Sequence, residues 1–264
     1  MVTSLWTGAA GMTGMQNNID NISNNLANVN TYGYKKTRAE FEDLLYQTIE
    51  MAGTPATADT VRPLGVQMGH GIRLAATQRM FSQGAMQASD GPADMAINGE
   101  GFFRVQMYDG SYAYSRDGSF KIDANGRMVS SQGYWLQPDI VMPENFDPAT
   151  IAISQDGRVS VRVAGNDDPW DVGQIELYRF PNAAGLNAVG ENLYKESVAS
   201  GSVVMARPGE NGMGTVYKGY LEMSNVSIVQ EMVDLIVAQR AYEFNSRTIQ
   251  TTDSMLATAT GLKR

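Results

Sequence analysis

The side chains that most often carry chemistry are scarce in this chain of 264 residues. It has no cysteine, which removes thiol nucleophiles, disulfides and thiolate metal sites together. Its one histidine, His70, lies between Gly69 and Gly71, and a Ser-His-Asp triad would depend on that residue alone. A multi-histidine zinc site is excluded. We therefore expect no enzyme, no catalytic or metal-ligating residues and no cofactor, and we interpret His70 as incidental.

Aspartate and asparagine residues that precede glycine suggest a second chemistry, calcium binding. An EF-hand loop requires spaced carboxylates that end in a glutamate, and the stretch around Asp123 lacks that pattern. Asp-Gly and Asn-Gly also favour tight turns between strands. We interpret four such pairs as hairpin turns: Asp109-Gly110, Asp117-Gly118, Asn125-Gly126 and Asp156-Gly157.

Composition excludes several classes of partner. The net charge is −8 and the pI about 4.7, with acidic residues spread along the chain, so a nucleic-acid-binding footprint is not expected. No run of about 20 apolar residues exists for membrane insertion. The start of the chain lacks the basic and apolar regions of a cleavable Sec signal.

The centre of the chain has the pattern of an antiparallel β domain. Apolar and alternating runs such as 102–107 and 158–163 lie between the turn dipeptides, from about residue 72 to 204. Before this region, residues 53–71 are rich in Gly, Pro, Thr and Ala, which predicts an extended arm or loop. We also predict a short helix from about Arg38 to Ile49.

Heptad patterns occur at both ends of the chain, and the helices that they predict would position its binding residues. The first runs through Leu5, Gly8, Met12, Met15, Ile19, Ile22, Leu26 and Val29, within a helix from about Ser4 to Asn28. The second, with polar gaps, runs through Ile228, Met232, Leu235, Gln239, Tyr242, Ser246, Ile249, Asp253 and Leu256, within a helix from about Ser224 to Ala259. A 3.5-residue repeat keeps one seam facing a partner helix. The ends are expected to pair with each other or with other copies.

Two further patterns point to intermolecular packing rather than one globular core. A second stripe on the C-terminal helix comprises Val237, Ala241, Phe244, Thr248, Thr251, Met255 and Leu262. Asparagines at Asn17, Asn21, Asn24 and Asn28 repeat on another face of the first helix, where amides suit a polar helix–helix seam better than a solvated surface. Gly8, Gly11 and Gly14 weaken this helix by about 1 kcal/mol each but permit close approach of another helix.

These patterns predict an α+β fold with nested segments. We assign 1–36 to an N-terminal helix of an inner domain, 37–75 to a short helix plus extended arm, 76–215 to a β-rich outer domain and 216–264 to a long C-terminal helix. The expected assembly interface is formed by Leu5, Met12, Met15, Ile19, Ile22, Asn24, Asn25, Leu26, Asn28, Val29, Ile228, Met232, Leu235, Gln239, Tyr242, Phe244, Ile249 and Leu256.

Several motifs resemble the bacterial flagellar rod and hook axial protein family. They are Ser23-Asn24-Asn25-Leu26-Ala27-Asn28-Val29-Asn30-Thr31 with Gly33-Tyr34-Lys35, the run 38–49, the stretches 96–103 and 114–120, and the ending from Glu222 through Gln239-Arg240-Ala241-Tyr242-Glu243 to Leu262. The resemblance implies paired terminal helices around a central channel, an outer β layer and helical polymerisation into the hollow distal rod. It also implies export through the flagellar type III apparatus, a position in the basal body across the periplasm, and contacts with proximal rod, hook and ring proteins.

Two alternatives remain open at this stage. The resemblance also covers a proximal rod or hook-type subunit; the arm at 46–70 would separate these, because in the family a longer arm accompanies a straight, stiff rod. A secreted β-domain enzyme or carbohydrate-binding module is the alternative from another class. Its activity would depend on acids such as Asp117 or Asp123.

Overall fold

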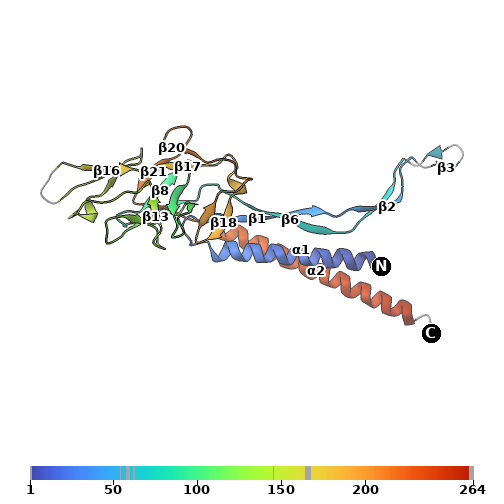
Figure 1. Ribbon diagram of the computed structural model, residues 1–264. Helices are drawn as coiled ribbons and strands as arrows, with labels where there is room; N and C mark the ends of the chain where they lie inside the picture. The colour runs from blue at the N-terminus through green and yellow to red at the C-terminus, as the bar shows by residue number, and fades with distance from the viewer. Residues whose placement is uncertain are drawn as a thin grey trace. The chain divides into compact units, whose positions relative to one another are not determined.

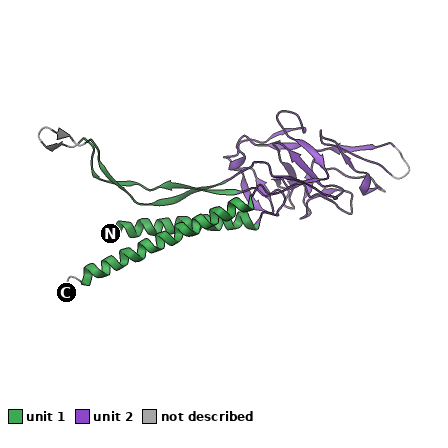
Figure 2. Cartoon of the chain, turned by 180° about the vertical axis from the view of Figure 1, so that it is seen from behind, with its two compact units in different colours: residues 1–27, 37–78, 227–264 green, residues 28–36, 79–226 purple. Residues whose placement is uncertain are grey.

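The computed structural model describes residues 2–53, 55–57, 60–61, 63–144, 146–163 and 168–261. It has an α+β fold that divides into two compact units (Figures 1 and 2). Unit 1 comprises residues 1–27, 37–78 and 227–264, and unit 2 comprises 28–36 and 79–226. Unit 1 therefore contains segments from both ends of the chain.

Unit 1 contains two long helices, α1 (Val2–Ala27) and α2 (Ile228–Gly261), which pack along one another (Figure 2). Its strands form three two-stranded sheets, β1 with β6, β2 with β5 and β3 with β4. These strands are β1 (Thr37–Asp43), β2 (Tyr46–Glu50), β3 (Pro55–Thr57), β4 (Thr60–Val61), β5 (Val66–Gly69) and β6 (Ile72–Arg79, whose last residue is assigned to unit 2).

The predicted helix from Arg38 to Ile49 is wrong, because this segment forms β1 and β2. Charged Arg38, Glu40 and Glu42 alternate with Ala39 and Phe41, which is the period of a strand. The Arg38 Nη2 and Glu40 Oε1 atoms lie 3.0 Å apart, as neighbours on one face of β1. The partner strands β5 and β6 come about 20–35 residues later in the chain, so the local sequence does not reveal the pairing.

Unit 2 is built around a seven-stranded antiparallel sheet in the order β11-β12-β13-β9-β10-β19-β18. Smaller sheets are β14-β15-β16, β17-β20, β21-β8 and β22-β7, and the unit also has two 3-10 turns. The elements are β7 (Met86–Ala88), β8 (Met95–Asn98), β9 (Phe103–Gln106), β10 (Tyr112–Ser115), β11 (Lys121–Ile122), β12 (Met128–Val129), β13 (Trp135–Gln137), η1 (Pro148–Thr150), β14 (Ala152–Ile153), β15 (Arg158–Val161), β16 (Trp170–Gln174), β17 (Leu177–Arg179), η2 (Ala183–Gly185), β18 (Asn187–Gly190), β19 (Leu193–Lys195), β20 (Val204–Ala206), β21 (Thr215–Lys218) and β22 (Tyr220–Glu222).

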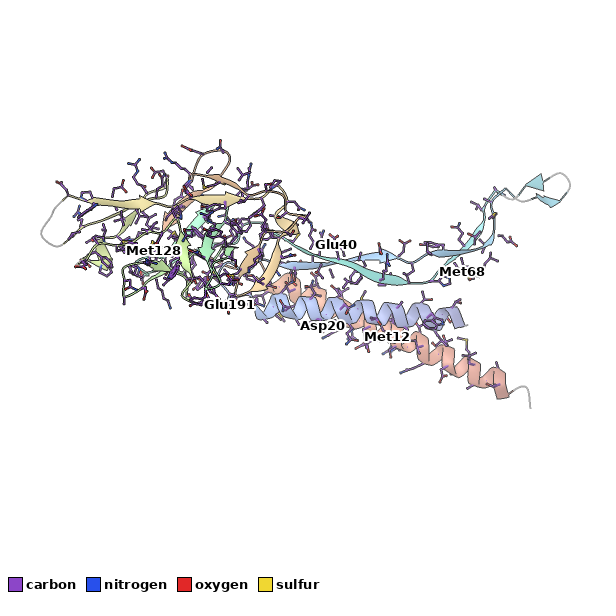
Figure 3. All side chains as sticks on the ribbon, in the orientation of Figure 1. Met12, Asp20, Glu40, Met68, Met128 and Glu191 are labelled. Carbon is purple, nitrogen blue, oxygen red and sulfur yellow. The ribbon has the colours of Figure 1, made fainter. Side chains whose placement is uncertain are left out.

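Strand alternation produces the core of unit 2. In β9, Phe103 and Val105 point inward and are buried, whereas Arg104 and Gln106 point outward. Side chains from eight or more strands fill this core, including Met128, which Figure 3 labels within the unit. The predicted antiparallel β domain is confirmed, and residues 215–222 belong to it as strands.

Helix α2 starts four residues later than predicted. Ser224 and Asn225 are held in unit 2 instead. The Asn225 Nδ2 donates to the carbonyl oxygen of Met80 at 2.8 Å, and its Oδ1 accepts from the Lys36 N–H at 2.7 Å. An asparagine that satisfies backbone groups of two other segments stabilises a non-helical conformation, which delays the helix.

Three of the four predicted hairpin turns are confirmed. Gly110, Gly126 and Gly157 have φ of 79°, 77° and 82° and join β9 to β10, β11 to β12 and β14 to β15. The prediction for Asp117-Gly118 is wrong, since the strands on either side of this pair do not pair with each other. Gly118 is instead required by a close backbone approach, because a Cβ there would lie 1.6 Å from the Met95 carbonyl oxygen.

The Asp117 carboxyl predicts a pH effect on stability. Burial raises its pKa, although its Oδ1 accepts from the Ser119 N–H at 2.9 Å. Because the folded state then holds its proton more tightly than the unfolded state, the free energy of unfolding decreases as pH increases from about 3.9. The total decrease is about 1.4 kcal/mol for each unit by which the folded-state pKa exceeds the unfolded-state pKa. Asp117→Asn keeps the acceptor and removes the charge, so we expect a flatter stability profile from pH 4 to 7 in urea titrations. The matched control is Asp123→Asn in an exposed turn; an equal change in both variants would contradict the assignment.

Candidate assembly interface

Glycines on α1 bring the two helices into close contact. A Cβ at Gly8 would lie 3.0 Å from Ile249 Cγ1, and one at Gly11 would lie 2.8 Å from Asn245 Nδ2. A larger residue at these positions would force the Ile249 and Asn245 side chains, or α2 itself, to shift. The predicted close helix approach is confirmed at Gly8 and Gly11 but not at Gly14, where a Cβ would lie 2.7 Å from Cδ1 of Ile72 in strand β6.

A polar cluster joins α1, β1 and α2 at one end of this helix pair. The Asn25 Nδ2 donates to the Thr37 carbonyl at 2.8 Å and to Glu231 Oε2 at 3.3 Å. The Thr37 N–H donates to Asn25 Oδ1 at 2.9 Å, and Asn21 Nδ2 donates to the Thr37 carbonyl at 3.0 Å. Asn25 and Glu231 are fully buried. Two of the asparagines of α1 are therefore used inside the chain, where each amide both donates and accepts.

On α1 and just after it, the structure places most expected interface residues at a contact. Ile22 and Asn25 are buried, while Leu5, Met12, Met15, Ile19 and Leu26 are half-buried. Asn24 is on the exposed side of α1. Asn28 and Val29 follow the helix, in unit 2, and are half-buried.

On α2, the face toward α1 is rotated from the expected stripe. Leu235, Ile249 and Leu256 are half-buried as expected, but the buried positions are Glu231, Ala238 and Thr252, with Asn245 beside Gly11. Sequence reasoning missed these residues because small and polar side chains were treated as gaps in an apolar repeat. Their exact spacing of seven was the signal that would have identified them.

Away from α1, helix α2 exposes several large apolar side chains among polar and charged ones. The expected residues Ile228, Met232, Gln239, Tyr242 and Phe244 lie here, together with Val237 and Met255 from the second stripe. Phe244 is 63% exposed and Val237 is 61% exposed. Sequence reasoning missed three more exposed residues, Val229, Val233 and Ile236. Leu262 lies outside the described residues. An apolar surface of this extent on one helix marks a site of protein contact.

The strands of unit 1 add a second exposed apolar surface. Leu45, Tyr46, Ile49, Met51 and Met68 are all exposed on β2, β5 and the residues beside them. Figure 3 labels Met68 on β5 of the two-stranded sheet that β5 forms with β2. A two-stranded sheet is marginal on its own, so these side chains need a covering surface.

The described residues contain neither a metal-ion cluster nor a membrane-spanning helix. No three His, Asp or Glu side chains gather there in a group that could hold a metal ion. In the same part of the chain, no helix is long and apolar enough to span a membrane.

Three family descriptions match the chain. They are "Flagella basal body rod protein" over residues 5–35, "Flagellar hook protein FlgE/F/G D1 domain" over 96–161 and "Flagellar basal body rod FlgEFG protein C-terminal" over 217–262. The chain is 56% identical to the flagellar basal-body rod protein FlgG of Borreliella burgdorferi, over the full length of both chains. This chain belongs to the flagellar basal-body rod protein family. It is a structural protein of that family and not an enzyme.

Two further relatives show how far along the chain the similarity extends. The rod protein FlgG of Buchnera aphidicola from Schizaphis graminum is 48% identical, over 97% of this chain and 98% of the relative. The flagellar hook protein FlgE of Helicobacter mustelae is 40% identical, but over only 53% of this chain and 32% of the hook protein. Rod proteins therefore match throughout, and the hook protein matches in part. The chain is a component of the flagellar basal body that assembles with other axial proteins.

Proposed function

We propose that this chain is a subunit of the distal rod, which polymerises helically into a hollow drive shaft. The shaft transmits torque and lets exported subunits pass through its bore. The observation that carries this proposal is the exposed apolar surface of α2, since a single copy leaves Phe244 and Val237 in water. A heterologous interface that does not close generates an open filament.

The proposed arrangement places α1 and α2 as a coiled-coil-like inner domain around the channel. Residues 1–27 and 227–264 would supply this domain, unit 2 (28–36 and 79–226) would supply an outer layer, and the strands between 37 and 75 would form an extended arm. Close approach at Gly8 and Gly11 supports helix pairing within one subunit. The exposed expected residues, Ile228, Met232, Gln239, Tyr242 and Phe244, then face neighbouring copies.

Partners and location follow from the same proposal. The rod would contact proximal rod proteins, the hook protein and the surrounding ring proteins while it crosses the periplasm. Its subunits would leave the cytoplasm through the flagellar export apparatus, without a cleavable Sec signal. Support for this comes from the family assignment.

The proximal rod and hook-type alternatives can be separated from the distal rod by the arm. Replacing residues 47–68 by an Asn-Gly turn would keep the pairing of Tyr46 with Gly69. We expect rods that still assemble but are curved or flexible in electron micrographs, because the exposed Ile49 and Met68 side chains, which this change removes, no longer contact neighbouring subunits. Gln67→Ala in the full arm is the control. Straight, rigid rods from the shortened chain would contradict a stiffening role for the arm.

A further inference from the structure

The outward face of the seven-stranded sheet carries an unusual group of side chains. Strand register sets Trp135 and Tyr112 on either side of Gln106, and Gln137 beside Arg104. Neighbours that point the other way, such as Leu136, are buried in the core. Tyr112 is 47% exposed and Trp135 is 39% exposed. We call Arg104, Gln106, Tyr112, Trp135 and Gln137 the Arg104 face.

Arg104 is held in place without a polar partner. Its guanidinium carbon lies 4.6 Å from the Tyr112 ring centroid and 4.3 Å from that of Tyr178, so the group is stacked between two tyrosines. No described residue accepts a hydrogen bond from it or forms an ion pair with it, and its Nε is buried. By contrast, Arg116 has two backbone carbonyl acceptors and Glu222. The terminal N–H groups of Arg104 are thus available to an acceptor from outside the chain, whereas its buried Nε is not.

We propose that the Arg104 face binds a carboxylate of a second copy of this chain. A guanidinium fixed by stacking presents parallel N–H groups that match a carboxylate in bidentate fashion. Tyrosine, tryptophan and arginine together form the usual centre of a protein interface. With 28 acidic and 20 basic residues, each copy offers its neighbour an acidic surface. This inference rests on the proposed polymerisation.

The edge of β16 is the matching surface on the other copy. Trp170 is 61% exposed there, between Asp168 and Asp171, and neither aspartate bonds to any residue that the structure describes. Four other exposed acids are already paired: Asp109 with Lys195, Asp139 with Arg127, Asp156 with Arg158 and Glu100 with Arg179. What distinguishes the β16 edge from the remaining exposed acids is the exposed Trp170 between its two aspartates. The β16 edge and the Arg104 face lie on different sheets, so their contact is heterologous, as an open filament requires.

Photo-crosslinking in assembled rods tests this contact. A benzophenone amino acid would replace Tyr112 in the full chain, and rods would be assembled from isotopically heavy and light copies. We expect heavy–light crosslinks between position 112 and the peptide that contains Trp170. The same probe at the fully exposed Val198 is the control and should not crosslink to that peptide.

Charge variants give an independent readout. Arg104→Gln should reduce the crosslink at least tenfold while the monomer keeps the circular dichroism spectrum of the folded chain, and Arg104→Asp combined with Asp171→Arg should restore it. Rods that form normally but crosslink from position 112 to another protein, to another segment or not at all would overturn the inference. Failure to form rods with the unsubstituted chain would instead count against the proposed polymerisation.

Discussion

Phe244→Asp is expected to abolish rod assembly while the monomer remains folded. Phe244 is 63% exposed in the single chain, so the substitution removes little from the monomer's own packing. In the polymer, the variant would lose about 1.5–3 kcal/mol of side-chain burial per subunit. It would also bury an unpaired carboxylate, at a further cost of several kcal/mol. Because about 1.4 kcal/mol changes an association constant tenfold, association should weaken by at least about a thousandfold.

Three other substitutions show how this result is to be interpreted. Gln250→Asp adds the same charge at an exposed position of α2 and should assemble normally if Phe244 acts through its apolar contact. Ile249→Asp and Leu26→Asp should also block assembly, but Ile249 contacts α1 at Gly8, so that variant should lose helix content as a monomer. Circular dichroism and sedimentation measure the two effects separately. Normal polymers from Phe244→Asp would show that this face of α2 is not an interface.

Lys35→Met should strongly destabilise unit 2. Lys35 Nζ lies 2.6 Å from Glu222 Oε1 and donates to the Ser82 carbonyl at 2.8 Å, and both charged side chains are fully buried. Glu222 also accepts from the Gly84 N–H at 2.9 Å and lies 3.2 Å from Arg116 Nε. Removing one partner of a buried ion pair typically costs about 3–5 kcal/mol. In this variant Glu222 loses its nearest cation and donor and keeps Arg116 and the Gly84 N–H. The thermal midpoint should fall by roughly 6–20 °C.

The control for Lys35 is an exposed pair in the same unit. Lys195 Nζ lies 3.7 Å from Asp109 Oδ2 at the surface, so Lys195→Met should change the free energy of unfolding by less than about 1 kcal/mol. Comparable decreases in the free energy of unfolding for Lys35→Met and Lys195→Met would contradict a stabilising role for the buried ion pair. The pair also explains why Gly33-Tyr34-Lys35 stands in the family motif, since this segment closes unit 2 with Tyr34 and Lys35 buried.

The sequence predicted the terminal helices and the β domain because their periods are strong. The 3.5-residue repeat of Leu5 to Leu26 and the alternation in 102–107 each specify one element. The strands at 37–50 were missed because their partners, β6 and β5, are distant in sequence. Only the alternation of Arg38, Glu40 and Glu42 with Ala39 and Phe41 indicated them.

The interface was harder to predict than the fold. On α2, the buried residues Glu231, Ala238 and Thr252 are polar or small, so hydrophobicity alone favoured Met232 and Gln239. Glu231 is buried because Asn25 of α1 donates to it, a pairing across 206 residues. The lack of a polar partner for Arg104 depends on where Tyr112 and Tyr178 lie, and no single segment encodes that.

Electron microscopy of the assembled polymer tests the central claim most directly, which is that α1 and α2 build the inner wall of a rod. A density map at side-chain resolution should show Gly8 and Gly11 against α2 of the same subunit, and Phe244 and Val237 buried against neighbouring subunits around a bore. A polymer in which Phe244 and Val237 remain in solvent, or whose contacts run through the β domains alone, would contradict the account.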